Sequence, residues 1–158
     1  MGVTKVEVRH EDFSLEEEMA ALRRQDQSAG AAVSFVGVVR NRNQGDRILA
    51  LELEHYPGMT ESAIRTIVSD ARKRWEIEDA VVIHRVGRLA IGEQIVLCLV
   101  TSEHRGEAFS ACEFIMDWLK TEAPFWKREQ TPKGLRWVEA RESDERSRDR
   151  WKTPGQGA

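Results

Sequence analysis

Apolar residues recur along the chain at two spacings, and each spacing predicts one type of element. Apolar residues three or four positions apart share one face of a helix, so this spacing predicts amphipathic helices. Apolar residues that alternate with polar ones, or that form short uninterrupted runs, predict strands. The pattern predicts helices at about 14–27, 60–75 and 103–122, and strands at 31–39, 49–54, 80–86, 94–101 and 135–138.

Local signals set the ends of the predicted helices. Ser14 and Glu17 have the spacing of a capping box, in which each side chain bonds a backbone N–H at the start of a helix. Thr60 has the residue type of an N-cap for the second helix. Pro124 ends the third helix, because the residue before a proline avoids the helical conformation. The polar, basic segment 40–47 between two strands predicts a loop.

The order of the predicted elements indicates the fold class. Several strands follow one another directly, whereas a doubly wound fold requires regular alternation of strand and helix. The strands at 80–86 and 94–101 are joined by a connection short enough for antiparallel neighbours. We therefore predict an α+β fold with a mostly antiparallel sheet and packed helices.

Length and charge are typical of one domain. The 158 residues include 24 Lys and Arg against 27 Asp and Glu, which gives a formal net charge of −3. A chain of this length buries a core without disulfides or metals, so we expect Cys98 and Cys112 to be buried, reduced thiols. We predict one domain at 1–140. Because residues 141–158 are highly charged and poor in apolar residues, we predict a solvated tail there, ordered at most on a partner.

Charge and hydropathy exclude several classes of protein. A near-neutral balance argues against binding nucleic acid or an anionic membrane through overall charge, so any anion site is local. No apolar run approaches the ~18 residues of a membrane-spanning helix, and the N-terminus has no apolar signal region. We therefore expect a cytoplasmic protein with no membrane contact.

Cations stand where predicted elements end, while common catalytic motifs are absent. The sequence has no phosphate-binding glycine loop and no His-Glu-x-x-His, and its histidines and cysteines lack metal-ligand spacing, so no metal is predicted. Arg40 follows a strand, His104 and Arg105 begin a helix, and Lys120 and Lys127 flank its end. A helix start attracts anions, which makes 102–105 a candidate phosphate site. Such cations are also ordinary surface residues, and their spacing alone does not separate the two interpretations.

Six segments of the sequence carry a more specific signal. Together they resemble the large, catalytic subunits of molybdopterin synthases, the MoaE family, in order from about residue 3 to about residue 145. The segments are Phe35–Asn41, Glu54–Met59, Ile83–Gly87, Ser102–Arg105, Asp117–Lys120 and Ala123–Glu129.

The resemblance implies a fold, partners and an activity. The fold is of the α/β-hammerhead type, and two large subunits form a dimer, so that the whole assembly is a heterotetramer. Each large subunit binds a ubiquitin-like, sulfur-carrying small subunit whose C-terminal Gly-Gly ends in a thiocarboxylate. The family transfers two sulfurs to cyclic pyranopterin monophosphate (precursor Z), which forms the dithiolene of molybdopterin for molybdenum cofactor biosynthesis. No metal or separate cofactor takes part.

The resemblance also implies roles for individual residues. Lys120 and Lys127 match the catalytic lysines; the chemistry favours Lys120 for proton transfer beside the thiocarboxylate and Lys127 for binding the phosphate or pterin. Segments that bind the substrate are matched by Val38, Val39, Arg40, His104, Arg105, Arg128 and Glu129, and residues that line the pocket by Phe35, Met116 and Arg141.

One expectation comes from helix geometry instead. If 103–122 is one helix, His104 and Lys120 are ~24 Å apart along its axis. One chain does not easily place both side chains on one small ligand. We therefore predict that His104 and Arg105 act across the dimer interface, completing the pocket that holds the other chain's Lys120, Lys127 and Arg40.

Two other functions are compatible with the same cations. A module that only docks a ubiquitin-like C-terminus needs cations but performs no chemistry. An RNA-binding domain is disfavoured by the net charge of −3 and by the absence of a pattern of stacking aromatics. Catalysis and docking remain open at this point, because both use the same residue types.

Overall fold

The computed structural model describes residues 2–138 and 142–151. Its larger sheet has four strands in the order β1-β6-β8-β2. Only β1 and β6 run parallel, and the other two neighbouring pairs in this sheet are antiparallel. The bounds are Thr4–Arg9 for β1, Ala31–Val38 for β2, Ala80–Arg85 for β6 and Gln94–Ser102 for β8.

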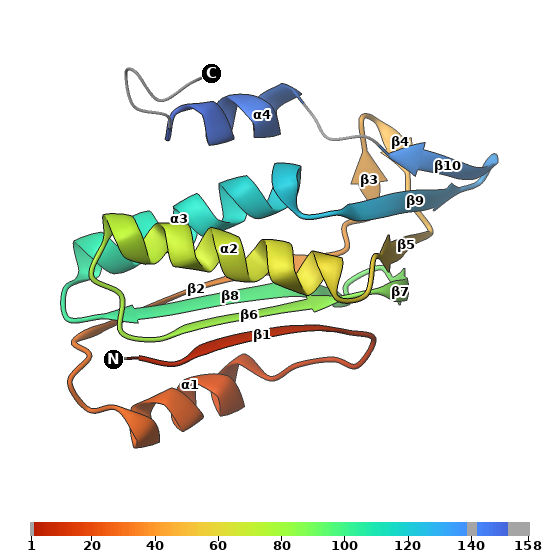
Figure 1. Ribbon diagram of the computed structural model, residues 1–158. Helices are drawn as coiled ribbons and strands as arrows, with labels where there is room; N and C mark the ends of the chain where they lie inside the picture. The colour runs from red at the N-terminus through yellow and green to blue at the C-terminus, as the bar shows by residue number, and fades with distance from the viewer. Residues whose placement is uncertain (1, 139–141, 152–158) are drawn as a thin grey trace.

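Helices cover both faces of this sheet (Figure 1). Helices α2 (Met59–Arg74) and α3 (Arg105–Glu122) pack on one face, where Cys98 and Val100 of β8 join the main core cluster. Helix α1 (Leu15–Gln25) packs on the other face against Leu97 and Leu99. Because successive strand residues point to opposite faces, the apolar run Ile95–Val100 of β8 contributes to the cores on both sides of the sheet, and the strand is buried from Val96 onwards.

A second, antiparallel sheet lies at one end of the molecule (Figure 1). Its order is β10-β9-β5-β7, and Leu51, Leu53 and Leu89 on its inner face pack with Val39. A short hairpin, β3 (Arg42–Asn43) and β4 (Asp46–Arg47), lies beside it. The strands of the sheet are β5 (Ala50–His55), β7 (Gly87–Ala90), β9 (Phe125–Thr131) and β10 (Gly134–Val138).

The predicted α+β class and mostly antiparallel pairing are confirmed. The long predicted elements are present with ends that shift by a few residues, and Ser14 caps α1 by accepting from the Glu17 N–H at 3.2 Å. Four short or polar strands, β1, β3, β4 and β7, and the longer β9 were not predicted. Their sequences lack a continuous apolar face, so pairing with neighbouring strands decides their structure.

The predicted role of Thr60 as an N-cap is wrong. Helix α2 begins one residue earlier, at Met59, after Gly58 with φ 84°. The Glu61 carboxylate accepts from the Gly58 N–H at 3.1 Å and so partners a backbone donor at the start of the helix. Thr60 lies inside the helix, fully buried, and its hydroxyl donates to the carbonyl oxygen of Pro124.

The C-terminal segment differs from the predicted solvated tail. Residues Glu142–Asp149 form helix α4, which lies beside α3 (Figure 1). The Trp151 ring packs edge-on against Trp75 and Phe114, and its Nε1 donates to the Asp117 carboxylate at 2.6 Å. One large aromatic side chain thus anchors a charged segment to its own chain.

Within the described ranges, no helix is both long and apolar enough to cross a membrane.

Candidate active site

Lys120 and Lys127 come from different elements but lie at the same end of the molecule. Lys120 is in the last turn of α3 and Lys127 is in β9, which follows α3 after a bend at Pro124. Both ammonium groups influence the titration of the buried His84, as does His55. Only residues 123 and 124 separate α3 from β9, and Phe125 at the start of β9 stacks on His84, so the two lysines belong to the same region, which we call the lysine end.

His84 is a buried residue at the lysine end. Its ring stacks on Phe125 with centroids 3.9 Å apart and planes 24° from parallel. Its Nδ1 lies 2.8 Å from the carbonyl oxygen of Arg85, so Nδ1 carries the proton and donates. Burial, with smaller contributions from Lys120, Lys127 and His55, lowers the pKa of His84 to about 4. The imidazole is therefore neutral at physiological pH.

Lys127 and Arg128 lie on opposite faces of strand β9. Lys127 pairs with Leu53 and lies on the inner face of the small sheet. Arg128 lies on the opposite face, where it donates to Glu52 at 2.6 Å and its guanidinium covers the Trp137 ring at 5.2 Å. Because neighbouring residues of a strand point to opposite faces, these two cations do not share one surface.

Glu129 lies on the same face as Lys127 and is held in a buried network. It is 4% exposed and accepts from both Asn43, at 2.9 and 3.1 Å, and Arg136, at 3.2 Å. The Asn43 side-chain oxygen in turn accepts from Arg40 at 3.3 Å. Glu129 thereby connects β9 to the β3–β4 hairpin and to Arg40, which places Arg40 at the lysine end.

The remaining predicted pocket residues differ in exposure. On β2, Phe35 is 39% exposed and Val38 is 48% exposed, while Val39 is buried beneath the small sheet. Met116 is buried in the main core on α3. Arg141 lies outside the residues that the structure describes.

His104 and Arg105 lie at the opposite end of helix α3 from Lys120. His104 is the N-cap of α3, and Lys120 is in the last turn of this 18-residue helix. Strand β2 also runs from one of these ends to the other. Its first residue, Ala31, pairs with Ser102 near His104, and its last residue, Val38, lies near Arg40 and pairs with Gln94. The structure therefore does not bring His104 and Arg105 to the lysines within one chain, as the helix geometry predicts.

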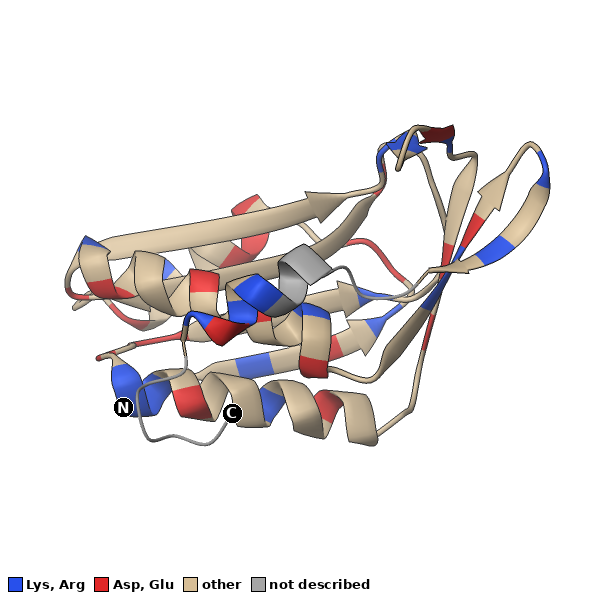
Figure 2. Cartoon of the chain, turned by 90° about the horizontal axis from the view of Figure 1, so that it is seen from above, with Lys and Arg blue, Asp and Glu red and all other residues tan. Residues whose placement is uncertain are grey.

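Positive and negative residues are mixed along the same elements. Figure 2 shows Lys and Arg interspersed with Asp and Glu on the helices and on the small sheet. Among the described residues, no three His, Cys, Asp or Glu side chains gather closely enough to hold a metal ion. Any anion site is therefore built from a few local cations.

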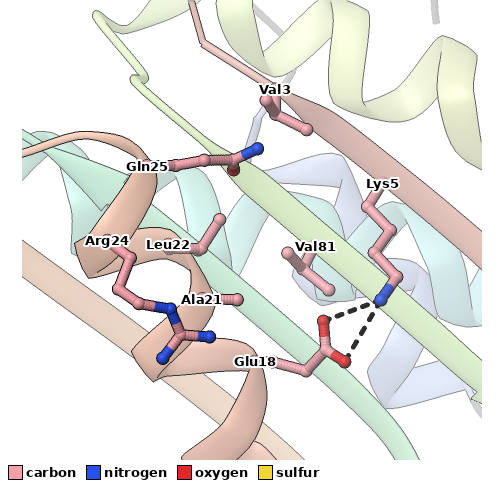
Figure 3. A pocket seen from close by; sticks show the side chains of 8 residues that line it. All are labelled: Val3, Lys5, Glu18, Ala21, Leu22, Arg24, Gln25 and Val81. Atoms are coloured by element: carbon pink, nitrogen blue, oxygen red, sulfur yellow. Dashed lines mark hydrogen bonds and ion pairs between the residues drawn. The ribbon is translucent and has the colours of Figure 1, made fainter.

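A cavity of about 420 Å³ lies elsewhere, between α1 and the edge of the large sheet. Figure 3 shows Lys5 bound to Glu18 across it, at 2.9 Å, with Leu22 and Val81 forming an apolar wall. None of its lining residues is a predicted site residue. This cavity is separate from the lysine end.

Comparison with known proteins decides the family. The sequence model of the MoaE protein family matches residues 8–122, most of the chain. The chain belongs to the MoaE family. The resemblance inferred from the six segments is therefore confirmed, and with it the predicted class of enzyme, a molybdopterin synthase catalytic subunit of molybdenum cofactor biosynthesis.

Similar proteins extend this MoaE match over nearly the whole chain. The molybdopterin synthase catalytic subunit of Ralstonia nicotianae is 58% identical over 92% of this chain and 83% of its own length. The solved molybdopterin biosynthesis MoaE protein of Burkholderia ambifaria has a TM-score of 0.80 and 49% identity, covering 94% of this chain and 97% of its own. A solved chain described as a complex of subunits 1 and 2 of molybdopterin-converting factor from Helicobacter pylori shares the fold, with a TM-score of 0.69 and 21% identity over 87% of this chain and 91% of its own.

Residues that support the site in this MoaE chain had no predicted role. His84 lies in one of the six segments, but its burial and its stacking on Phe125 depend on elements distant in sequence. Asn43 lies in a segment predicted to be a loop, although it is buried against Glu129. A short polar hairpin gives no sequence signal for burial, so only the structure assigns these positions.

Proposed function

We propose that this chain transfers sulfur from the C-terminal thiocarboxylate of a ubiquitin-like small subunit to cyclic pyranopterin monophosphate. Two such transfers build the dithiolene of molybdopterin. Membership of the MoaE family supports this reaction class. The single structural observation that supports it is that Lys120 and Lys127 lie on two elements joined by one short bend, at which Phe125 stacks on the buried His84.

The lysine end suits a reaction between two anions. A thiocarboxylate and a cyclic phosphate repel one another, and local cations reduce that repulsion while they orient both groups. In each transfer a C–S bond to the substrate replaces a C–O bond, and the thiocarboxylate of the small subunit becomes a carboxylate; Lys120 donates the proton that the departing oxygen takes up, and Lys127 holds the phosphate or pterin. Arg40 adds a third cation, anchored through Asn43 and Glu129.

The sulfur donor is the C-terminal tail of a separate small subunit. The structure from Helicobacter pylori, described as a complex of two subunits, supports a two-subunit assembly for proteins of this fold. A Gly-Gly terminus is narrow enough to enter a site between elements, because glycine has no side chain. The sulfur of its thiocarboxylate then reaches Lys120, while the folded part of the small subunit stays outside the site.

A second copy of this chain completes the site. Strand β2 is an edge strand of the large sheet, and Phe35 and Val38 expose apolar surface there. Unpaired edge strands and exposed apolar side chains are surfaces that a partner covers. In this dimer His104 and Arg105 of one copy bind the substrate held by the lysines of the other.

The main test is product formation from precursor Z and thiocarboxylated small subunit. Lys120→Ala lowers turnover by about 10²-fold to 10⁴-fold, because it removes the proton-transferring group, while the small subunit still binds. Lys73→Ala is the matched control, since the Lys73 side chain is 75% exposed on α2 and forms a surface ion pair with the neighbouring Asp70. Normal turnover by Lys120→Ala would contradict catalysis and favour the docking function.

Mixing two inactive variants tests the shared site. If Lys120 and His104 belong to different copies, a mixed dimer of Lys120→Ala and His104→Ala contains one intact site. Random exchange of subunits then restores about a quarter of wild-type activity. If both residues act within one chain, no site is intact and mixing restores nothing.

A further inference from the structure

A hydrogen bond and a proline restrict the bend between the two lysines. Phe125 donates its N–H to the Ala123 carbonyl at 2.9 Å, which closes a three-residue turn around Pro124. Proline restricts the backbone further by fixing its own φ. Because only this bend separates the end of α3 from β9, its conformation sets how Lys120 and Lys127 lie relative to each other.

A buried hydroxyl from another element fixes the outer side of the bend. Thr60, in the first turn of α2, is 0% exposed and donates to the Pro124 carbonyl at 2.9 Å. The Thr60 hydroxyl oxygen also accepts from the Tyr56 N–H at 3.0 Å. Thr60 thus connects the β5–α2 turn to the bend, and both of its partners are backbone groups that need a hydrogen bond when buried.

A buried aromatic contact fixes the other end of the bend. The His84 ring lies flat on Phe125 at 3.9 Å, and His84 is itself held by the 2.8 Å bond from Nδ1 to the Arg85 carbonyl. Strand β6, which carries His84, is central in the large sheet and buried along its whole length. The His84 ring therefore fixes the position of Phe125 at the start of β9.

We propose that Thr60 and His84 are positioning residues that hold the Ala123–Phe125 bend and so keep Lys120 and Lys127 in register for sulfur transfer. This inference rests on the proposed function of the two lysines. Neither Thr60 nor His84 needs to touch the substrate. Each contacts the bend from a different element, Thr60 through its hydroxyl and His84 through its ring.

We expect the loss of the Thr60 hydroxyl to affect the catalytic rate, because it alters the bend between the two lysines. Thr60→Val keeps the volume but leaves the Pro124 carbonyl and the Tyr56 N–H without their partner, so the bend relaxes. A displacement of about 1 Å between catalytic groups can lower a rate about 100-fold. We expect Thr60→Val to lower kcat about 10-fold to 100-fold, with small-subunit affinity unchanged.

Conservative and matched variants separate positioning from general destabilisation. Thr60→Ser retains the hydroxyl, so we expect it to restore most of kcat. Thr66→Val makes the same change on the same helix, where the hydroxyl only donates to Ser62 at the surface, and we expect it to leave kcat unchanged. Each complex is assayed well below its own melting temperature. Unchanged kcat in a folded Thr60→Val complex would overturn the proposed role of Thr60.

A second pair of variants tests His84 independently, should Thr60→Val fail to fold. His84→Phe keeps a flat ring against Phe125, whereas His84→Leu removes it. We expect His84→Leu to lose at least about 10-fold more kcat than His84→Phe, because the ring positions the start of β9. Equal kcat for the two folded variants would overturn the role of the stack.

A double-mutant cycle identifies the route of the effect. If Thr60 acts through the lysines, Thr60→Val costs little further single-turnover rate once Lys120 is already alanine. A full, additive loss in that background would mean that Thr60 acts elsewhere and would overturn the proposal. Failure of the wild-type complex to form product would instead contradict the proposed function, so the two failures are distinguishable.

Discussion

The two ends of helix α3 carry predicted site residues in contrasting surroundings. At the lysine end, buried partners from α2, β6 and the β3–β4 hairpin hold the backbone and Arg40. At the other end, the side chains of His104 and Arg105 are exposed, and the one ion-pair contact of the His104 ring among the described residues is with Glu103 at 3.7 Å. One end is organised by its own chain, whereas the other presents exposed side chains, which the proposed second copy would cover.

Of the effects that test this contrast between the two ends, the largest concerns whether the exposed end depends on a second copy. We expect activity per chain to fall more than about 10-fold when the complex is diluted until the dimer separates, because each site then loses His104 and Arg105. Activity and mass are measured together across the dilution series. Full activity of a single large subunit bound to its small subunit would contradict the shared site and remove the contrast.

The next effect uses the titration of His84 at the lysine end. Its pKa is about 4 in the folded chain and 6.5 when exposed, so the unfolded chain binds the proton first as pH falls. Stability is therefore complete above about pH 6.5 and is lost towards pH 4, by about 3 kcal/mol in the limit.

Urea unfolding at pH 7 and pH 5 measures this loss. Carboxylates also titrate in this range, so the relevant quantity is the difference between wild type and His84→Phe, which removes the imidazole. We expect the variant to lose less stability on acidification than the wild type. Parallel pH dependences would show that His84 is not buried as a neutral ring.

The Asn43 network gives a smaller effect. Asn43→Ala leaves Glu129 without two hydrogen bonds and releases Arg40, so we expect a loss of about 1–3 kcal/mol in unfolding free energy. Asn41→Ala, at an exposed position in the same loop, is the control. Equal stability of the two variants would mean that the network does not organise this end.

The smallest effect belongs to the exposed end. Glu103→Gln removes a long, exposed ion pair with His104, and we expect the unfolding free energy to change by less than about 0.5 kcal/mol. Thermal unfolding of the separate chain measures it. A loss above about 1 kcal/mol would show that this end is also organised within one chain.

The sequence predicted the elements whose signals are local. Helix α3 and strand β8 follow from continuous apolar patterns and from Pro124, since these signals lie within the element itself. Strand β9 was not predicted, because Lys127, Arg128 and Glu129 make it polar on both faces. Its structure depends on pairing with β5 and β10, which are distant or later in the chain.

The site divides in the same way. The sequence by itself identified the cations, the family and, through the rise of an α-helix, the separation of His104 from Lys120. Only the tertiary structure showed that Thr60 bonds to Pro124, that His84 stacks on Phe125, and that Trp151 anchors α4. Residue types and hydrophobic periodicity can be taken directly from the sequence. The burial of a single polar group cannot, because it depends on contacts between residues far apart in sequence.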